Sequence, residues 1–341
     1  MVRDALEAAR LQVAALVGAT PRQVVFTSGG TEAINAAVWG ATRRLPGAPV
    51  LCADVEHSAV REASARLAPT EVVPVDVSAR LDIEAVAARL ADTSRPRPAL
   101  VHCQWANHEV GTVQPVHEIV ALCRAAGVPV HVDAAAACGH LVIDADALGA
   151  DLVSISAHKI GGLPGAGALV IRRGSRFEPL IVGGEQERAR RAGLEALPAL
   201  VAFGAAAEAL GAGDQRLLHE EAGRARGQIA ALAAAATSVE GVAVVGPSND
   251  DERLPSLLCL GVPGVEAEPV LIGLDRAGVA VHSGSACSSE SIEPSPVLEA
   301  MGVDASHSLR VSVGWSTTDE DVAAFARAFA DVVAGLRALR S

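Results

Sequence analysis

The chain of 341 residues lacks the features that mark several large classes of protein. Its longest uncharged apolar run, residues 196–207, is mostly alanine, contains Pro198 and is too short to span a bilayer. Acidic residues outnumber basic ones, and the net charge of −12 argues against nucleic acid or anionic membranes as main partners. Half of the residues are apolar, which excludes a disordered chain and allows one large α/β unit, with or without a smaller domain.

The six cysteines show neither a Cys-x-x-Cys pair nor the Cys/His spacing of a zinc site, so no metal is expected. Most of them, such as Cys52 and Cys259, stand in apolar runs and are predicted to be small core residues. The first residues carry acids and no apolar block, so no secretory leader is predicted. The expected location is the cytoplasm, where thiols stay reduced.

Lysine is almost missing: of 28 basic residues, Lys159 is the single lysine and the rest are arginine. A lysine amine loses its proton far more easily than a guanidinium, so Lys159 suits a task that needs a free amine, such as a Schiff base. An arginine-rich composition explains the count equally well.

Short β-branched runs alternate with Ala- and Leu-rich stretches in the first part of the chain. This alternation predicts an α/β fold with a mainly parallel sheet of seven strands between helices, and function at the carboxyl ends of the strands. The expected strands are 24–26, 50–52, 72–75, 99–102, 128–132, 152–156 and 168–171, with helices at 31–41, 83–90 and 116–126.

The pattern changes after about Leu194. An Ala-rich helical region reaches about Thr237 and is interrupted by Gly211 and Gly213; strands are expected at 242–245, 257–260 and 309–313, with a closing helix at 319–339. We therefore predict a large domain over 1–213 and a smaller α+β domain over 214–341.

Three segments carry polar residues at the ends of expected strands. Residues 27–32, Thr-Ser-Gly-Gly-Thr-Glu, open a helix and could form either a phosphate cradle or an ordinary capped turn. Asp133 is either a ligand-facing acid or a helix cap, and residues 154–159 place Lys159 beside two serines and a histidine. Together they suggest pyridoxal phosphate, which needs a lysine, a carboxylate for its ring nitrogen and a phosphate anchor.

The sequence resembles the cysteine desulfurases of the NifS/IscS-like branch of the class V aminotransferase family, which are fold-type I pyridoxal-phosphate enzymes. Eight motifs carry the resemblance in family order: TSGGTE at 27–32, VEHSAV at 55–60, NHEVGTVQPV at 107–116, HVDA at 131–134, SAHK at 156–159, GGEQERARRAG at 183–193, SGSACSS at 283–289 and SLRVSVG at 308–314.

The resemblance implies a role for each matching residue. Lys159 forms the Schiff base and moves protons, Asp133 keeps the pyridine nitrogen protonated, and His57 stacks on the ring and shuttles a proton. The resemblance also implies that the cofactor phosphate is bound by Gly30, Thr31, Ser156 and His158, and that His108 contacts the cofactor. It implies that Arg310 and Asn107 bind the substrate.

Cys287 stands apart from the other cysteines because it lies in a Gly/Ser loop sequence rather than an apolar run. The resemblance implies that its thiolate attacks the substrate sulfur and becomes a persulfide while alanine leaves. The short Ser-Gly-Ser-Ala-Cys form of this segment points, within the family, to delivery of sulfur to iron–sulfur assembly or to tRNA- and thio-cofactor-modifying acceptors.

Four departures from the family pattern are present. The usual N-terminal Asp-x-Ala-Ala-Thr-Thr segment is absent, so either the start is truncated or misassigned, or part of the substrate pocket is missing. His108 replaces an asparagine, Ala136 a glutamine and Leu194 a threonine. Loss of several polar contacts predicts cofactor binding weaker by about one to a few kcal/mol, at roughly 1 kcal/mol per hydrogen bond.

The expected activity is therefore that of a cysteine desulfurase converting L-cysteine to L-alanine with a sulfur-acceptor protein as partner. Loop 183–193 resembles the family segment that crosses to a second subunit, which implies a homodimer. Alternatives on the same scaffold are a selenocysteine lyase, another C–S lyase or a class V transaminase. A degenerate paralogue that binds a partner and turns over poorly is the alternative of another kind.

Overall fold

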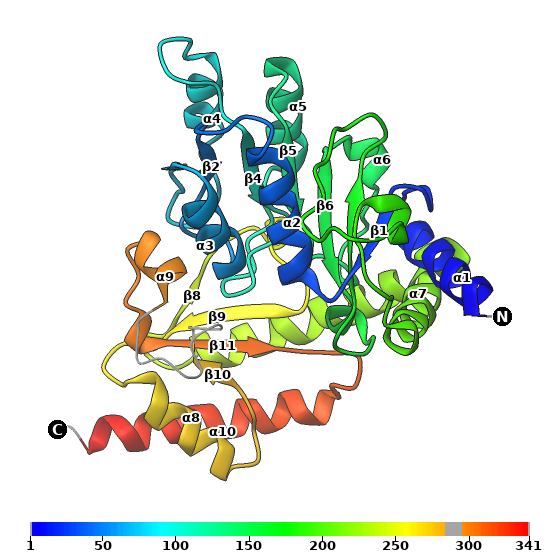
Figure 1. Cartoon of the computed structure of the whole chain (residues 1–341). Coiled ribbons are helices and arrows are strands. Elements are labelled where there is room, and N and C mark those ends of the chain that lie inside the picture. The colour runs from blue at the N-terminus through cyan, green and yellow to red at the C-terminus, as the bar shows by residue number, and fades with distance from the viewer. Residues whose placement is uncertain (1, 284–294, 340–341) are drawn as a thin grey trace. The chain divides into compact units, whose positions relative to one another are not determined.

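The computed structural model describes residues 2–283 and 295–339, apart from the side chains of 212 and 213. The chain divides into two compact units (Figure 1). The first comprises Met1–Pro74, Leu81–Ala106 and Gln114–His219, and the second Val75–Arg80, Asn107–Val113 and Glu220–Ser341. Among the described residues, no helix combines the length and the apolar character needed to cross a membrane.

The first unit alternates strands and helices along the chain, as the sequence predicts. Its strands are β1 (Val24–Thr27), β2 (Val50–Cys52), β3 (Thr70–Val72), β4 (Leu100–Gln104), β5 (Val130–Asp133), β6 (Leu152–Ser156) and β7 (Gly167–Ile171). Its helices are α1 (Val2–Leu16), α2 (Gly30–Thr42), α3 (Ser58–Leu67), α4 (Ile83–Ala91), α5 (Val116–Ala126) and α6 (Ala145–Leu148), together with the first part of α7 (Leu197–Thr237).

The seven strands form one sheet in the order β1-β7-β6-β5-β4-β2-β3. Strands β3, β2, β4, β5 and β6 are parallel, and β7 is antiparallel to both of its neighbours, β6 and β1. The predicted α/β fold with a mainly parallel seven-stranded sheet is confirmed.

Helices cover both faces of this sheet (Figure 1). Helix α2 packs its alanines on one face against Val25, Leu169 and Ile171. On the other face α5 contacts β4 and β5. Side chains alternate along a strand, and Leu100 packs beside Ala41 of α2. His102 and Gln104, two and four residues further on, therefore face α2 as well.

The prediction of a strand at 72–75 is wrong in its placement, because β3 is Thr70–Val72. Its three residues pair in parallel with the three residues of β2. Pro74 has no N–H to donate to such a ladder, and Val72 on this edge strand is 56% exposed. The apolar run Val72-Val73 therefore marked the end of the strand rather than its centre.

The second unit holds a four-stranded sheet in the order β10-β11-β9-β8, antiparallel throughout. Its core is lined by one face of that sheet and by α7, α8 and α10, with Leu258, Leu260, Leu274, Phe325 and Phe329 nearly inaccessible. Its elements are β8 (Ala243–Val245), β9 (Leu257–Gly261), α8 (Ala267–Arg276), β10 (His282–Ser283), α9 (Pro296–Ala300), β11 (Ser308–Ser312) and α10 (Asp319–Ala338).

Helix α7 carries an irregularity where the sequence predicts an interruption. Asp214 and Gln215 have φ of 56° and 62°, in the left-handed region that non-glycine residues rarely adopt. The backbone thus departs from helical geometry directly after Gly213, five residues before the boundary between the two units at His219.

Candidate functional site

The polar segments singled out in the sequence meet at one edge of the first unit's sheet. Strands β1, β2, β4, β5 and β6 all run in the same direction, so their carboxyl ends share that edge. The turn 27–30 follows β1, His57 follows β2 by five residues, Asp133 ends β5, and Lys159 follows β6. In open α/β sheets this edge is where ligands bind.

The turn before α2 presents backbone N–H groups for which the described residues provide no side-chain cap. Its N-cap residue is Gly29, which has no side chain to bond the first N–H groups of the helix. A Cβ built on Gly29 would meet nothing within 4 Å, whereas one built on Gly30 would lie 3.4 Å from Cβ of Ser156. The turn is therefore open on one side and packed against the end of β6 on the other.

Gly167, the first residue of β7, lets this turn approach the sheet. A Cβ built there would lie 2.6 Å from the carbonyl carbon of Gly29, which is a steric clash. The Gly-rich segment after Lys159 thus supports the turn before α2 from the neighbouring strand β7. The composition of this segment alone did not indicate that role.

Asp133 is buried and fixed in orientation. Its Oδ1 accepts hydrogen bonds from Ser154 Oγ at 2.9 Å and from the backbone N–H of Ala135 at 3.1 Å. Within the described ranges no hydrogen bond to Oδ2 is found, so this oxygen remains available for a protonated ring nitrogen.

His57 caps α3: its Nδ1 accepts the backbone N–H of Ala59 at 3.1 Å. A neutral His57 therefore carries its proton on Nε2. Burial lowers the pKa of His57, the positive charge of Lys159 lowers it further, and Asp133 opposes both. These interactions show that His57, Asp133 and Lys159 share one electrostatic environment and that His57 is neutral near pH 7.

Lys159 lies in the 3-10 helix Ala157–Ile160, which directly continues β6, and its side chain is exposed. Three residues before Lys159, Ser156 Oγ is 2.9 Å from Nδ1 of His158. Burial and the nearby Lys159 charge both lower the pKa of His158. The segment thus presents one amine, one hydroxyl and one neutral imidazole on the same edge.

A buried carboxylic acid, Glu56, was not singled out in the sequence. It is 1% exposed, its Oε1 accepts the backbone N–H of Gln104 at 2.7 Å, and its Oε2 has no hydrogen-bond partner among the described residues. Burial, and then the charge of Asp133, raise the pKa of Glu56 to about 8. Glu56 is therefore protonated near pH 7.

Loop 183–193 was predicted as a family motif, but the contacts that hold it were not. Arg191 donates to both carboxylate oxygens of Glu32, at 2.9 and 3.2 Å. Glu187 pairs with the buried Arg10 of α1 at 2.6 and 2.8 Å and also accepts the backbone N–H of Phe26 in β1. These contacts join residues more than 150 positions apart, which no local pattern signals.

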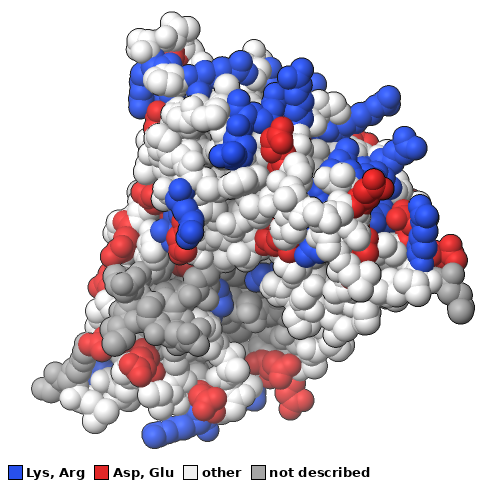
Figure 2. All heavy atoms as spheres, in the orientation of Figure 1, with Lys and Arg blue, Asp and Glu red and all other residues white. Residues whose placement is uncertain are grey.

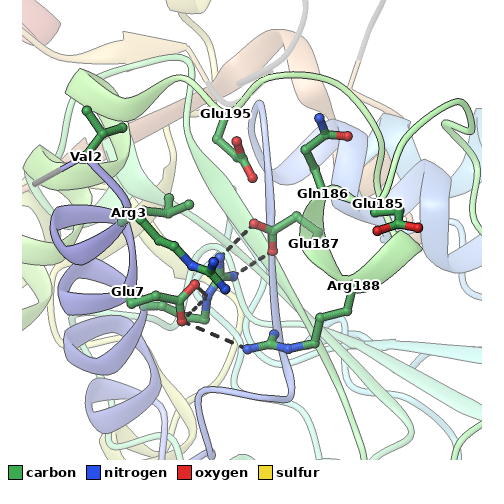
Figure 3. A pocket seen from close by; sticks show the side chains of 10 residues that line it. Val2, Arg3, Glu7, Glu185, Gln186, Glu187, Arg188 and Glu195 are labelled. Carbon is green, nitrogen blue, oxygen red and sulfur yellow. Dashed lines mark hydrogen bonds and ion pairs between the residues drawn. The ribbon is translucent and has the colours of Figure 1, made fainter.

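Between these two anchors the backbone is strained. Glu187, Arg188 and Ala189 have φ of 49°, 59° and 59°, three consecutive non-glycine residues in the left-handed region. The loop and α1 also line a cavity of about 600 Å³, into which Glu7 and Arg188 extend (Figure 3). The buried Arg10–Glu187 pair thus holds a loop that would not keep this shape by itself.

The opposite, amino-terminal edge of the sheet has a different character. A cavity of about 420 Å³ there is lined by Arg44, Arg97, Arg172 and Arg176, with Asp151 paired to Arg172. Basic side chains gather at the top of the face shown in Figure 2, over the part of the first unit that holds α4 and α5. This edge is separate from the one that carries Lys159.

The remaining predicted residues belong to the second unit. Asn107 is buried, and its Oδ1 accepts the backbone N–H groups of Glu109 and Val110, each at 2.8 Å. Arg310 of β11 is partly buried, and its neighbours in the sequence, Leu309 and Val311, are core residues. Its side chain donates to the carbonyl oxygen of His108 at 3.2 Å. Cys287 lies outside the described residues.

The five described cysteines are all buried and free, which confirms the prediction of core residues for Cys52 and Cys259. Burial raises the pKa of the Cys52, Cys123, Cys138 and Cys259 thiols to about 12 and raises that of Cys103 as well. None of these five thiols supplies a thiolate at neutral pH.

The residues of the first unit fit pyridoxal phosphate. The uncapped N–H groups at Gly29–Thr31, with Ser156 and His158 close by, form a donor set for a phosphate. The free Oδ2 of Asp133 suits the ring nitrogen, and Lys159 supplies the amine.

Comparison with known proteins agrees with this reading. The model of the family described as aminotransferase class-V matches residues 1–325. The chain belongs to the class V aminotransferase family. A cysteine desulfurase of Cereibacter sphaeroides is 40% identical over 98% of this chain and 86% of its own length, and cysteine desulfurase IscS 1 of Archaeoglobus fulgidus is 34% identical over 99% and 88%.

The fold of this class V member also matches a solved structure. A NifS-like protein from Rickettsia africae superposes with a TM-score of 0.86 at 29% identity, covering 97% of this chain and 88% of that chain. The chain thus spans most of the length of each of these relatives.

Proposed function

We propose that the protein is a pyridoxal-phosphate-dependent cysteine desulfurase that converts L-cysteine to L-alanine and leaves a persulfide on Cys287. The observation that carries this proposal is the convergence of the single lysine, Lys159, with Asp133, His57 and an open phosphate cradle at one sheet edge. The match to relatives named cysteine desulfurase over nearly the whole chain supports the choice of reaction.

The cofactor, when bound, supplies an electron sink that makes the bonds at the substrate Cα and Cβ labile. Lys159 holds and moves a proton at Cα, and the exposed position of its side chain leaves the amine accessible. Asp133, fixed by Ser154 and Ala135, keeps a proton on the ring nitrogen through its Oδ2. His57 is neutral near pH 7 with its proton on Nε2; it would shuttle a proton by taking one up on Nδ1, at the cost of the Ala59 hydrogen bond, and releasing one from Nε2.

In the proposed reaction, sulfur passes from the substrate to Cys287. The Cys287 thiolate attacks the substrate sulfur; an S–S bond forms, the C–S bond breaks, and Cβ takes up a proton so that alanine is released. The sequence contains six cysteines, and the five described ones are buried with raised pKa values, which supports Cys287 as the nucleophile. The persulfide then passes to an acceptor protein, in keeping with the IscS name of one relative.

The substrate carboxylate is assigned to Arg310 together with Asn107, and both residues belong to the second unit. Arg310 donates to the carbonyl oxygen of His108, and a planar guanidinium is the side chain best suited to paired hydrogen bonds with a carboxylate. We also propose a homodimer, because Val182 and Leu194, which flank loop 183–193 on its two sides, are 74% and 89% exposed. The reducing cytoplasm suits the five free thiols.

The deciding experiment measures alanine release from L-cysteine, with excess pyridoxal phosphate and reductant, for wild type, Cys287→Ser and Cys123→Ala. Cys123 lies buried on α5 and serves as the matched control. We expect turnover that disappears in Cys287→Ser and persists in Cys123→Ala. Turnover that survives Cys287→Ser would instead indicate another C–S lyase, a selenocysteine lyase or a transaminase. If wild type and both variants are inactive, the protein is a degenerate paralogue.

A further inference from the structure

Arg191 and Glu32 form a paired contact next to the proposed phosphate cradle. Glu32 is the third residue of α2, in the same helical turn as the donors of Gly30 and Thr31. Its Oε2 accepts the backbone N–H of Ser28 at 2.9 Å, and both of its oxygens accept from Arg191. The side chains are 13% and 21% exposed, so water screens the pair only in part.

This arrangement places a carboxylate where a phosphate has to bind. Glu32 holds the turn by bonding Ser28, and an acid in the first turn stabilises the helix through its dipole. The same charge repels a phosphate dianion at the neighbouring N–H groups. Burial raises the pKa of Glu32, but hydrogen bonds from Arg191 and Ser28 outweigh this effect and lower it overall, so Glu32 is ionised at neutral pH.

We propose that Arg191 is a positioning residue for the cofactor phosphate: by neutralising Glu32 it lets one carboxylate shape the turn without repelling the phosphate that the turn holds. This inference rests on the proposed function, because it assumes that Gly29–Thr31 bind the phosphate of pyridoxal phosphate. Through Arg191, the strained loop that Arg10 and Glu187 secure becomes part of the cofactor site.

The change in affinity for pyridoxal phosphate in charge variants distinguishes this role of Arg191 from simple packing. Arg191→Gln leaves Glu32 uncompensated beside the cradle and is expected to weaken binding of pyridoxal phosphate on the order of tenfold. Glu32→Gln/Arg191→Gln removes the repelling charge and should recover most of that loss, since glutamine still accepts the Ser28 N–H. Arg191→Lys, which keeps the charge, should bind nearly as wild type does.

The measurement is titration of the apoprotein with pyridoxal phosphate and, separately, with pyridoxal, followed by the absorbance of the bound ligand. Pyridoxal lacks the phosphate, so its affinity should be the same in all variants. The tenfold loss should shrink at about 1 M salt, where charges are screened within roughly 3 Å. Melting temperatures of each variant report any general loss of structure.

Arg89→Gln is the matched control, because Arg89 pairs in the same two-pronged way with Glu71 on the edge strand β3. It should leave both affinities unchanged. Equal binding by Arg191→Gln and wild type, or a double variant as weak as Arg191→Gln, would overturn the role of Arg191. Wild-type protein that binds pyridoxal phosphate no more tightly than pyridoxal would overturn the cradle itself, and with it the proposed cofactor site.

Discussion

The backbone N–H of Gln104 donates to the carboxyl group of Glu56 at 2.7 Å, and the Gln104 side chain donates to the carbonyl oxygen of Val55 at 3.0 Å. The end of β4 thereby holds the segment that leads to His57. Glu56 occupies this position as a neutral acid, because burial and then the nearby Asp133 raise its pKa to about 8. The protonation state of Glu56 has a measurable consequence for stability.

Glu56→Gln should make the free energy of unfolding less sensitive to pH. Folded Glu56 keeps its proton up to a pH of about 8, whereas an unfolded glutamate loses it near the ordinary value of 4.5. Unfolding therefore releases a proton between these two values, and wild-type stability falls as pH rises through them. Relative to wild type, Glu56→Gln should gain roughly 1 to 3 kcal/mol between pH 5 and 8 in urea unfolding.

Glu71→Gln is the control for this measurement, because the pKa of Glu71 is lowered, chiefly by the Arg89 hydrogen bond. Its stability difference from wild type should stay constant from pH 5 to 8. A constant difference for Glu56→Gln as well would show that Glu56 is ionised in the folded protein.

His102 and His131 should destabilise the protein in mild acid. Their Nδ1 atoms are 2.8 Å apart, and neither Nε2 has a partner among the described residues. Burial lowers the pKa of His131 to about 4 and also lowers that of His102. Both are neutral in the folded state while unfolded histidines protonate below about 6.5, so stability present above that pH is lost as pH falls toward 4.

The variant His102→Leu/His131→Leu tests this expectation by urea unfolding. Replacing two partners by apolar side chains of similar size is often nearly neutral, so the change at pH 7.5 should be within about 1 kcal/mol. At pH 5 the variant should be the more stable protein. Parallel pH profiles for the two proteins would contradict the assignment of a neutral pair.

Arg10→Met should destabilise the first unit by roughly 3 to 5 kcal/mol, because it leaves the Glu187 charge buried without a partner. It should also speed proteolysis within 183–193, whose left-handed residues depend on this anchor. The control is Arg188→Ala: Arg188 is 42% exposed and lies 3.9 Å from Glu7, so its loss should cost less than about 1 kcal/mol. Equal effects of the two changes would contradict the anchoring role.

Gly167→Ala should weaken pyridoxal phosphate binding by moving the turn before α2. The new Cβ would lie 2.6 Å from the carbonyl carbon of Gly29, and relieving such a clash typically costs about 1 to 3 kcal/mol. Gly223→Ala is the control, since a Cβ at Gly223 in α7 meets nothing within 4 Å and alanine favours a helix. Unchanged affinity in Gly167→Ala would show that the turn tolerates displacement.

The sequence predicted those parts of the site that depend on residues close together in the chain. Asp133 and Lys159 each follow a recognisable strand, and parallel strands bring their carboxyl ends to one edge. Pairs such as Arg191 and Glu32, 159 residues apart, depend on which loop returns to which helix. Glu56 stood inside a quoted motif, but its burial is decided by β4, whose Gln104 lies 48 residues further along.

Most expected strands lie within about two residues of the observed ones, but the strand at 72–75 ends three residues too late and the two-residue strand β10 was not predicted. The misplaced strand at 72–75 shows that apolar residues also occupy exposed edges, where a following proline ends the ladder. The glycines in the sequence were enough to predict the break in α7 after Gly213, because glycine is unfavourable in the interior of a helix.

The exposed side chain of Lys159 also makes the chain unusually easy to follow by chemical labelling. A lysine-specific protease has one internal cutting site, which divides the protein into residues 1–159 and 160–341. A carbonyl compound fixed to that amine by hydride reduction blocks the cut. The fraction of chain left full-length on a denaturing gel therefore counts occupied molecules directly, with no second amine side chain to dilute the signal.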